Sequence, residues 1–177
     1  MPHEYRFVPV SRDDYPMLRR WLAQPHMAGW WGAPEAEIAL IDGDLGAGFC
    51  DMRIVWADRP FGFVQDYPVR TYGAPHYGHL PDEARALDIF LGDPAYLGAG
   101  HGAGFLKARA AALFAQGTPA LAVDPDPENH RAVATFARAG FRPLGMKAAE
   151  DGAPVLVMDM WPEGLDSGRT ADEKDLI

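Results

Sequence analysis

The chain has 177 residues, of which 48% are hydrophobic and 23% are charged. These values are typical of a globular protein and exclude a wholly disordered chain, a collagen-like fibre and a disulfide scaffold. A chain of this length buries about two-thirds of its unfolded surface in one core, and we expect residues 1–162 to form one domain. Residues 163–177 hold five acidic and two basic residues without apolar periodicity, which predicts a disordered tail.

Acidic residues outnumber basic residues by 25 to 16, a net charge of −9. Nucleic acids and anionic membranes bind clustered Lys and Arg, so we expect neither as a partner, whereas a cationic small molecule would be attracted. The single cysteine, Cys50, cannot form an intrachain disulfide. With no apolar signal or membrane segment apparent, we expect a cytoplasmic protein. The sequence leaves a monomer and a homodimer both open.

The first half of the chain predicts a strand, two helices and a hairpin. Residues 5–10 alternate weakly as a strand, and residues 13–24 form a helix with Leu18, Trp21 and Leu22 on its apolar face. Pro34 suits the first turn of a helix that extends to about residue 45. Residues 49–56 and 61–72 predict two strands joined as a hairpin, followed by a loop over residues 73–83.

The second half alternates strands with helices. Residues 86–91 predict a buried strand, and a helix follows with Leu106, Ala110, Leu113 and Phe114 on one face. Residues 120–123 form another strand. The next helix is predicted to have Asp126 as its N-cap and Gly140 at its end, with an apolar face of Asn129, Ala132, Val133, Phe136 and Ala137. Strands over residues 141–146 and 155–161 complete a mixed α/β domain.

A glycine-rich turn joins the buried strand to its helix, with glycines at positions 98, 100, 102 and 104. Glycine lets the backbone approach an anion, and the free amides of a first helical turn can bind phosphate. A dinucleotide-binding fold is one interpretation, because Gly98, Gly100 and Ala103 fit G-x-G-x-x-G/A and Asp124 follows at a suitable distance. That fold needs several further strand–helix units, which the remaining chain does not supply. A P-loop is excluded because no Gly-Lys-Ser/Thr follows.

From Leu87 onward the chain resembles the GCN5-related N-acetyltransferases (GNAT), which bind acetyl-coenzyme A. Their motif Arg/Gln-x-x-Gly-x-Gly/Ala is matched by Gly100 and Gly102, with Leu97 in the place of Arg or Gln. Their motif Asn-x-x-Ala-x-x-x-Tyr-x-x-x-Gly-Phe is matched by Asn129, Ala132, Gly140 and Phe141, with Phe136 in the place of tyrosine. The resemblance implies the GNAT fold, with a mixed central sheet of about six to seven strands and flanking helices.

Within that family the chain is most similar to the aminoglycoside 6'-N-acetyltransferases. The segment from Leu18 to Gly32 resembles their Leu-x-x-Trp-Leu…His…Trp-Trp-Gly, and residues 124–129 resemble their Asp-Pro-x-Pro-x-Asn loop. Asp88 lies where they have a strand aspartate. The related siderophore acyltransferases have histidine at that position, with otherwise similar segments.

The resemblance implies acetyl-coenzyme A as co-substrate, held by backbone and side chains of two segments, and no metal. The pyrophosphate would contact Gly98, Ala99, Gly100, His101, Gly102 and Ala103. Backbone groups of Ile89, Phe90 and Leu91 would pair with the pantetheine arm, and Asn129 and Phe136 would flank the thiol end. Tyrosine at the position of Phe136 is thought to protonate the departing thiolate in the family, so solvent or another group must do so here. A coenzyme A thiolate is a good leaving group, so activity can survive this replacement.

Asp88 is the candidate catalytic residue, because a buried carboxylate can bind the acceptor ammonium and take its proton. An ion-paired structural aspartate is the alternative. Asp124 ends a strand at the ligand-binding edge of the sheet and is a candidate contact for acceptor amines, or a plain turn residue. Candidate substrate contacts, each with a structural alternative, are Trp30, Trp31, Gln65, Tyr67 and Asp151.

Two other features receive structural interpretations. His76 and His79 suggest a metal site only if a third ligand exists, and a solvated loop is favoured. Cys50 lies beside an acid, which raises a thiol pKa, so we do not expect a nucleophile.

These observations predict an N-acetyltransferase for a primary amine of a polycationic small molecule, most simply an aminoglycoside. Acylation of an N6-hydroxylysine siderophore precursor is the first alternative. A non-catalytic module that binds coenzyme A or a regulatory ligand is the second.

Overall fold

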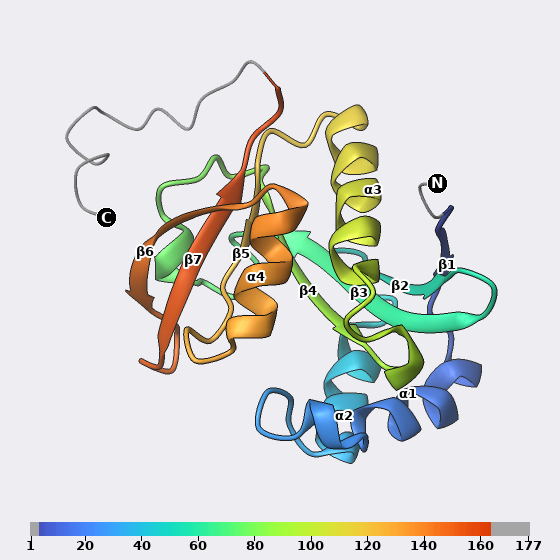
Figure 1. Ribbon diagram of the computed structural model, residues 1–177. Helices are drawn as coiled ribbons and strands as arrows, with labels where there is room; N and C mark the ends of the chain where they lie inside the picture. Colours follow the sequence, from blue (N-terminus) through green and yellow to red (C-terminus); the bar gives the residue numbers. More distant parts are fainter. Residues whose placement is uncertain (1–3, 164–177) are drawn as a thin grey trace.

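The computed structural model describes residues 4–163, and most of the predicted tail lies outside them. One seven-stranded sheet has the order β1-β2-β3-β4-β5-β7-β6 (Figure 1). β4 and β5 are parallel, and all other neighbouring strands are antiparallel. The strands are β1 (Arg6–Pro9), β2 (Asp51–Trp56), β3 (Pro60–Pro68), β4 (Arg85–Leu91), β5 (Leu121–Val123), β6 (Arg142–Ala148) and β7 (Pro154–Met160). The mixed sheet and the predicted order of elements are confirmed.

Four α-helices flank this sheet: α1 (Tyr15–Leu22), α2 (Pro34–Asp44), α3 (His101–Ala115) and α4 (His130–Ala139). Short 3-10 turns cover Arg12–Asp14, Pro25–Met27, Pro75–Tyr77 and Pro94–Tyr96. Pro34 begins α2 as predicted, because its missing N–H is not needed in a first turn. No helix within residues 4–163 is long and apolar enough to cross a membrane.

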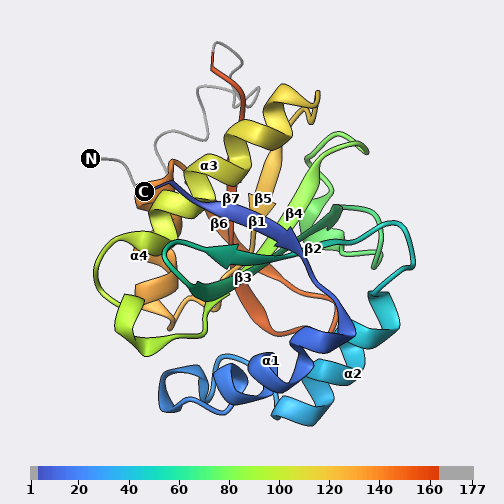
Figure 2. The same ribbon diagram turned by 90° about the vertical axis from the view of Figure 1, so that its right-hand side faces the viewer.

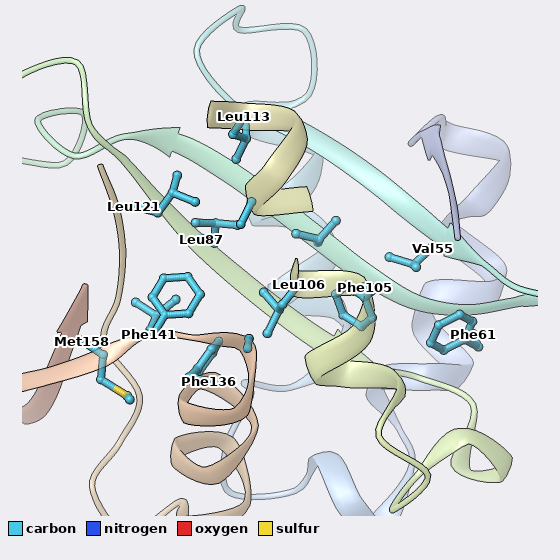
Figure 3. Packing of buried hydrophobic residues seen from close by; sticks show 14 of the residues in the cluster. Val55, Phe61, Leu87, Phe105, Leu106, Leu113, Leu121, Phe136, Phe141 and Met158 are labelled. Atoms are coloured by element: carbon cyan, nitrogen blue, oxygen red, sulfur yellow. The ribbon is translucent and has the colours of Figure 1, made fainter. Parts of the chain in front are cut away.

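Strand alternation divides the sheet into two apolar faces. Figure 2 shows α3 on one side and α1 and α2 on the other. The α3–α4 face packs around Phe105, Leu106 and Leu121, each fully buried (Figure 3). The α1–α2 face packs Leu18 and Trp21 against Phe63 and Phe90. Burial of each such side chain contributes about 1.5–3 kcal/mol, so the two faces hold the helices in place.

Two predictions about segments were wrong. Helix α4 begins at His130, and Asn129 is its N-cap, whose side-chain oxygen accepts the Ala132 N–H at 3.1 Å. Asp126 instead accepts the Glu128 N–H at 2.8 Å, which forms a turn before the helix. On the apolar face of α4, Ala139 rather than Ala137 is buried.

The strand predicted over residues 61–72 ends at Pro68, and the loop predicted over residues 73–83 is present but is partly buried, so residues 69–84 form one connecting segment. It folds over the sheet and buries Val69, Tyr77 and Leu80 against β4, β5 and β7. His76 is 4% exposed. The apolar residues of this segment follow neither a helical nor a strand period, so its burial could not be predicted from the sequence.

A buried ion network lies between α3 and the sheet. Asp66 on β3 is fully buried, and its carboxylate contacts Arg85 at 2.5 Å and Arg109 at 2.6 Å. Arg109 also contacts Asp51 at 3.0 Å. The network compensates the cost of burying these charges. Because side chains alternate along a strand, Asp66 lies on the opposite face of β3 from Gln65 and Tyr67.

Candidate active site

A cleft of about 580 Å³ opens where the two parallel strands separate. β4 and β5 are paired only at Arg85↔Leu121 and Ala86↔Ala122, and then diverge. The cleft is lined by residues 25–31, 87–91 and 97 on one side, and by residues 124–126, 128–132, 135 and 136 on the other. The cleft therefore lies at the carboxyl ends of parallel strands, where ligands bind in α/β sheets.

The diverging edge of β4 offers backbone groups to an extended ligand. β4 pairs with β3 along its whole length, but in the described structure it has no strand partner on its β5 side beyond Ala86. Ile89, Phe90 and Leu91, predicted to contact the cofactor arm, line this part of the cleft. A pantetheine arm contains amides that can pair with such an edge as a strand would.

The glycine turn and the N-terminus of α3 adjoin the cleft through Leu97. Gly100 has φ +84°, which favours glycine, and its carbonyl accepts the first helical hydrogen bond from Gly104 at 3.0 Å. The amides of His101, Gly102 and Ala103 therefore precede the helical ladder and can donate to phosphate. These groups fit the phosphate end of coenzyme A, although residues 98–103 do not line the cleft itself.

Gly102 has a second role, in helix packing. A Cβ at this position would lie 2.9 Å from Cγ2 of Thr135 on α4 and 3.3 Å from Leu91 on β4. The absence of a side chain therefore lets α3 approach α4 closely. Thr135 lines the cleft, and sequence analysis did not identify it.

Asp88 lies on the wall of the cleft, on the sheet face that packs against α1 and α2. Its Oδ2 accepts a hydrogen bond from Gln65 Nε2 at 2.8 Å. Burial raises the pKa of Asp88 to about 6, and the charge of Asp124 acts in the same direction, whereas interactions with Gln65 and Tyr67 lower it. A carboxylate with this pKa is ionised at neutral pH and can still accept a proton efficiently.

Asp124 follows β5 and lines the other side of the same cleft. Its Oδ2 lies 2.8 Å from Nε2 of His76, which reaches it from the segment of residues 69–84. Burial raises the pKa of Asp124, and the contact with His76 opposes that rise. The structure thus brings Asp88 and Asp124 to one cleft and pairs Asp124 with a histidine that sequence analysis had assigned to a solvated loop.

The two tryptophans differ in their surroundings. Trp30 is 46% exposed and lines the cleft. Trp31 also lines it, but its ring packs edge-on against Phe90 at a centroid distance of 5.0 Å. Trp30 therefore offers an exposed surface to a ligand, while Trp31 mainly supports the wall.

Asn129 and Phe136 line the cleft from α4. The Asn129 side-chain oxygen caps the helix, and its side-chain NH2 can donate to a ligand. Phe136 is 6% exposed and packs edge-on against Phe141 at a centroid distance of 5.9 Å. It thus forms an apolar part of the wall and has no proton to give.

The remaining predicted residues lie outside the cleft lining. Gln65 and Tyr67 lie beside Asp88 on β3 and act on it directly. Asp151 is exposed in the β6–β7 turn, where it accepts the Ala153 N–H at 2.9 Å.

His26 lines the cleft and contacts the Leu91 carbonyl at 2.7 Å. In the sequence, only its place in the segment before the two tryptophans pointed to it.

Cys50 lies near Gln65, with its Sγ 3.8 Å from Gln65 Oε1. Burial raises the pKa of the Cys50 thiol to about 12, and the charges of Asp44 and Asp88 add to this rise. The thiol is therefore protonated at neutral pH, in agreement with the sequence interpretation. Within residues 4–163, no group of three or more His, Cys, Asp or Glu side chains could hold a metal ion.

Comparisons with known proteins agree with this architecture. The family described as an acetyltransferase (GNAT) domain matches residues 11–147. Aminoglycoside N(6')-acetyltransferase type 1 of Klebsiella pneumoniae is 28% identical over 159 residues, covering 84% of this chain and 79% of the relative. A crystal structure of aminoglycoside acetyltransferase AAC(6')-Ib in complex with coenzyme A has a TM-score of 0.80 and 25% identity, covering 90% of this chain and 96% of that one.

A second structure, of AAC(6')-Ib in complex with coenzyme A and kanamycin, has a TM-score of 0.79 at 24% identity, covering 90% of this chain and 96% of that one. It supports the fold. The family match spans more than three-quarters of the chain, from α1 to β6. The cleft between β4 and β5 and the glycine turn lie inside it. This chain therefore belongs to the GNAT family of acetyl-CoA-dependent acetyltransferases.

Proposed function

We propose that this protein transfers acetyl from acetyl-CoA to the 6'-amino group of an aminoglycoside. The observation that carries the proposal is the placement of two carboxylates, Asp88 and Asp124, on facing walls of one cleft beside the exposed Trp30. Carboxylates in a partly desolvated cleft bind ammonium groups, and an exposed indole gives a flat surface for a sugar ring. The aminoglycoside acetyltransferase relative from Klebsiella pneumoniae supports the same substrate class.

Asp88 acts as the proton acceptor in this mechanism. The acceptor amine gives its proton to Asp88, directly or through a water, and its nitrogen attacks the thioester carbonyl carbon. The C–N bond forms as the C–S bond breaks, the sulfur leaves as a thiolate, and the second proton of the original ammonium passes from the nitrogen to water. The N-terminus of α3 and the edge of β4 hold the co-substrate, so the two reactants meet in a fixed geometry.

Phe136 gives this chain no hydroxyl beside the departing sulfur. A thiolate needs no proton to leave, and solvent can protonate it after release. Asp126 and Glu128 add negative charge at the rim of the cleft, which favours a polycationic acceptor. Modification of the drug would lower the sensitivity of a host to it. The need for acetyl-CoA and the free thiol of Cys50 both favour the cytoplasm as the compartment.

Coenzyme A release with purified protein tests this proposal. The acceptor panel is kanamycin, tobramycin, spermidine and N6-hydroxylysine, each with wild type and Asp88→Asn. We expect turnover of the aminoglycosides and a fall in kcat of about 10²–10⁴-fold in Asp88→Asn. Asp13→Asn, which changes an exposed acid that does not line the cleft, is the matched control and should retain full activity.

The other outcomes separate the alternatives. Turnover of N6-hydroxylysine alone would assign the protein to siderophore acylation. Binding of acetyl-CoA without turnover of any acceptor would refute the aminoglycoside proposal and favour a binding module. Mass spectrometry of the kanamycin product would show whether the 6'-nitrogen carries the acetyl group.

A further inference from the structure

The segment of residues 69–84 carries a buried histidine whose role the mechanism above does not use. His76 lies in the 3-10 turn Pro75–Tyr77, and its side chain is 1% exposed, whereas that of Asp124 is 26% exposed. The imidazole therefore approaches Asp124 from the protein interior, while the carboxylate lines the cleft. Its ring also packs against Tyr77 at a centroid distance of 4.1 Å, which fixes its orientation.

The hydrogen bonding of His76 indicates its protonation state. Nε2 lies 2.8 Å from Asp124 Oδ2, and Nδ1 is buried without a hydrogen-bond partner among the described residues. An imidazolium would leave an N–H unpaired at the buried Nδ1 and would add a buried charge, whereas the neutral ring with its hydrogen on Nε2 leaves only an unpaired lone pair at Nδ1. A neutral histidine donates to Asp124 without cancelling its charge. Lysine or arginine in its place would neutralise the carboxylate.

Asp124 needs hydrogen-bond donors because burial and nearby negative charges oppose its ionisation. Burial raises the pKa of Asp124, and the negative charge of Glu150 adds to the rise. The charges of Asp124 and Asp88 also repel each other across the cleft. The buried Tyr77 hydroxyl lowers the pKa of Asp124, as His76 does, and the buried Tyr67 also interacts with Asp124 electrostatically. The contact with His76 opposes the effect of burial and favours the carboxylate.

We propose that His76 is a positioning residue for acceptor binding: its Nε2–H holds one oxygen of Asp124 and keeps the carboxylate ionised, so that the second oxygen can bind an acceptor ammonium group. The inference rests on the proposed function for the identity of the acceptor. The pairing of His76 with Asp124 does not depend on that identity. The segment of residues 69–84 thereby takes part in acceptor selection, although only its partner Asp124 lines the cleft.

Two variants of His76 test the inference. His76→Ala removes the donor, and His76→Gln places an amide N–H near the position of Nε2 without a titrating group. We expect His76→Ala to raise the KM for kanamycin about tenfold, with the KM for acetyl-CoA and kcat changed less than about twofold. His76→Gln should recover most of the affinity. His79→Ala is the matched control, because His79 lies in the same segment but pairs with Asp159 at 3.3 Å.

A second measurement needs no acceptor. The carboxyl ¹³C resonance of Asp124, assigned with Asp124→Asn, reports its titration in the free protein. We expect His76→Ala to move that titration to higher pH, and His76→Gln to return it toward that of wild type. Thermal unfolding of each variant shows whether the protein remains folded at the assay temperature.

Several results would overturn the inference. They are an Asp124 titration that does not move in His76→Ala, an equal rise of both KM values, or the same rise in KM for kanamycin in His79→Ala. Wild-type protein that does not acetylate kanamycin would instead refute the proposed function. The Asp124 titration would then decide the inference about His76: a shift to higher pH in His76→Ala would support it, and no shift would refute it.

Discussion

Gln65 and Asp88 lie directly opposite each other in the β3–β4 ladder, and Gln65 Nε2 donates to Asp88 Oδ2 at 2.8 Å. The amide is oriented from its other end as well, because Gln65 Oε1 lies 3.8 Å from the Cys50 thiol. Gln65 on β3, held by Cys50 just before β2, thus orients the carboxylate that we propose as the proton acceptor. Side chains directly opposite each other on neighbouring strands are close enough to hold each other's orientation.

Removal of this donor should change the pH dependence of the reaction. The hydrogen bond from Gln65 lowers the pKa of Asp88, which burial raises to about 6. Catalysis needs the ionised carboxylate, so kcat/KM should fall as the pH drops below about 6 in wild type. In Gln65→Leu the pKa of Asp88 rises, and the decline should begin at higher pH. Profiles of kcat/KM between pH 5 and pH 8 measure this, with the exposed Gln116→Leu as the control; identical profiles for the three proteins would contradict the prediction.

Asp88 should make the free energy of unfolding fall as the pH rises, whereas a salt-bridged acid makes it rise. The pKa of Asp88 is about 6 in the folded protein and near the ordinary value of 3.8 in the unfolded chain. The folded state therefore binds more protons between these values, and stability falls as the pH rises through them. Asp88→Asn removes this effect. The difference in free energy of unfolding between the variant and wild type should therefore shift in favour of the variant by on the order of 1–3 kcal/mol from pH 4 to pH 7. Urea denaturation at both pH values measures the gain, and an equal difference at pH 4 and pH 7 would argue against it.

Because α3 and α4 approach closely at Gly102, a side chain added there should lower stability, and a smaller residue opposite it should restore part of the loss. In Gly102→Ala the new Cβ would lie 2.9 Å from Thr135 Cγ2, so the helices must separate, at a cost of about 1–3 kcal/mol. Thr135→Ser removes that methyl group. We expect the double variant Gly102→Ala/Thr135→Ser to recover part of the loss in free energy of unfolding, a non-additive result for two residues in contact. Strict additivity of the two single changes would show that they do not interact.

The ion network under α3 should contribute far more to stability than a surface ion pair does. Asp66→Asn leaves Arg109 and Arg85 without their buried carboxylate and should cost about 3–5 kcal/mol. Asp42→Asn breaks an exposed pair with Arg12 and should cost less than about 1 kcal/mol. Chemical denaturation of the two variants compares them. A loss in Asp66→Asn no larger than that in Asp42→Asn would mean that solvent reaches the network.

The strands and most helix limits could be predicted from the sequence because their signals are local. Pro34 begins α2, Gly140 ends α4 with φ +111°, and Leu18, Trp21 and Leu22 are buried on one face of α1. The start of α4 could not be predicted as well. Asp126 and Asn129 are both good N-cap residues, and only the chain path from β5 decides which one caps the helix.

Asp88, Asp124 and the glycine turn could be identified from residue type, spacing and family resemblance: Asp88 is an acid inside an apolar strand, Asp124 follows a strand, and the glycine turn precedes a helix. Their placement around one cleft could not be predicted from the sequence, because it depends on β4 and β5 separating after two paired residues. The partners of the two carboxylates were also beyond sequence analysis. Gln65 and His76 lie 23 and 48 residues away from Asp88 and Asp124, respectively. Residue type and local spacing determined which groups are present; the folding of distant segments against one sheet decided their burial and partners, because desolvation and hydrogen bonding depend on neighbours in space.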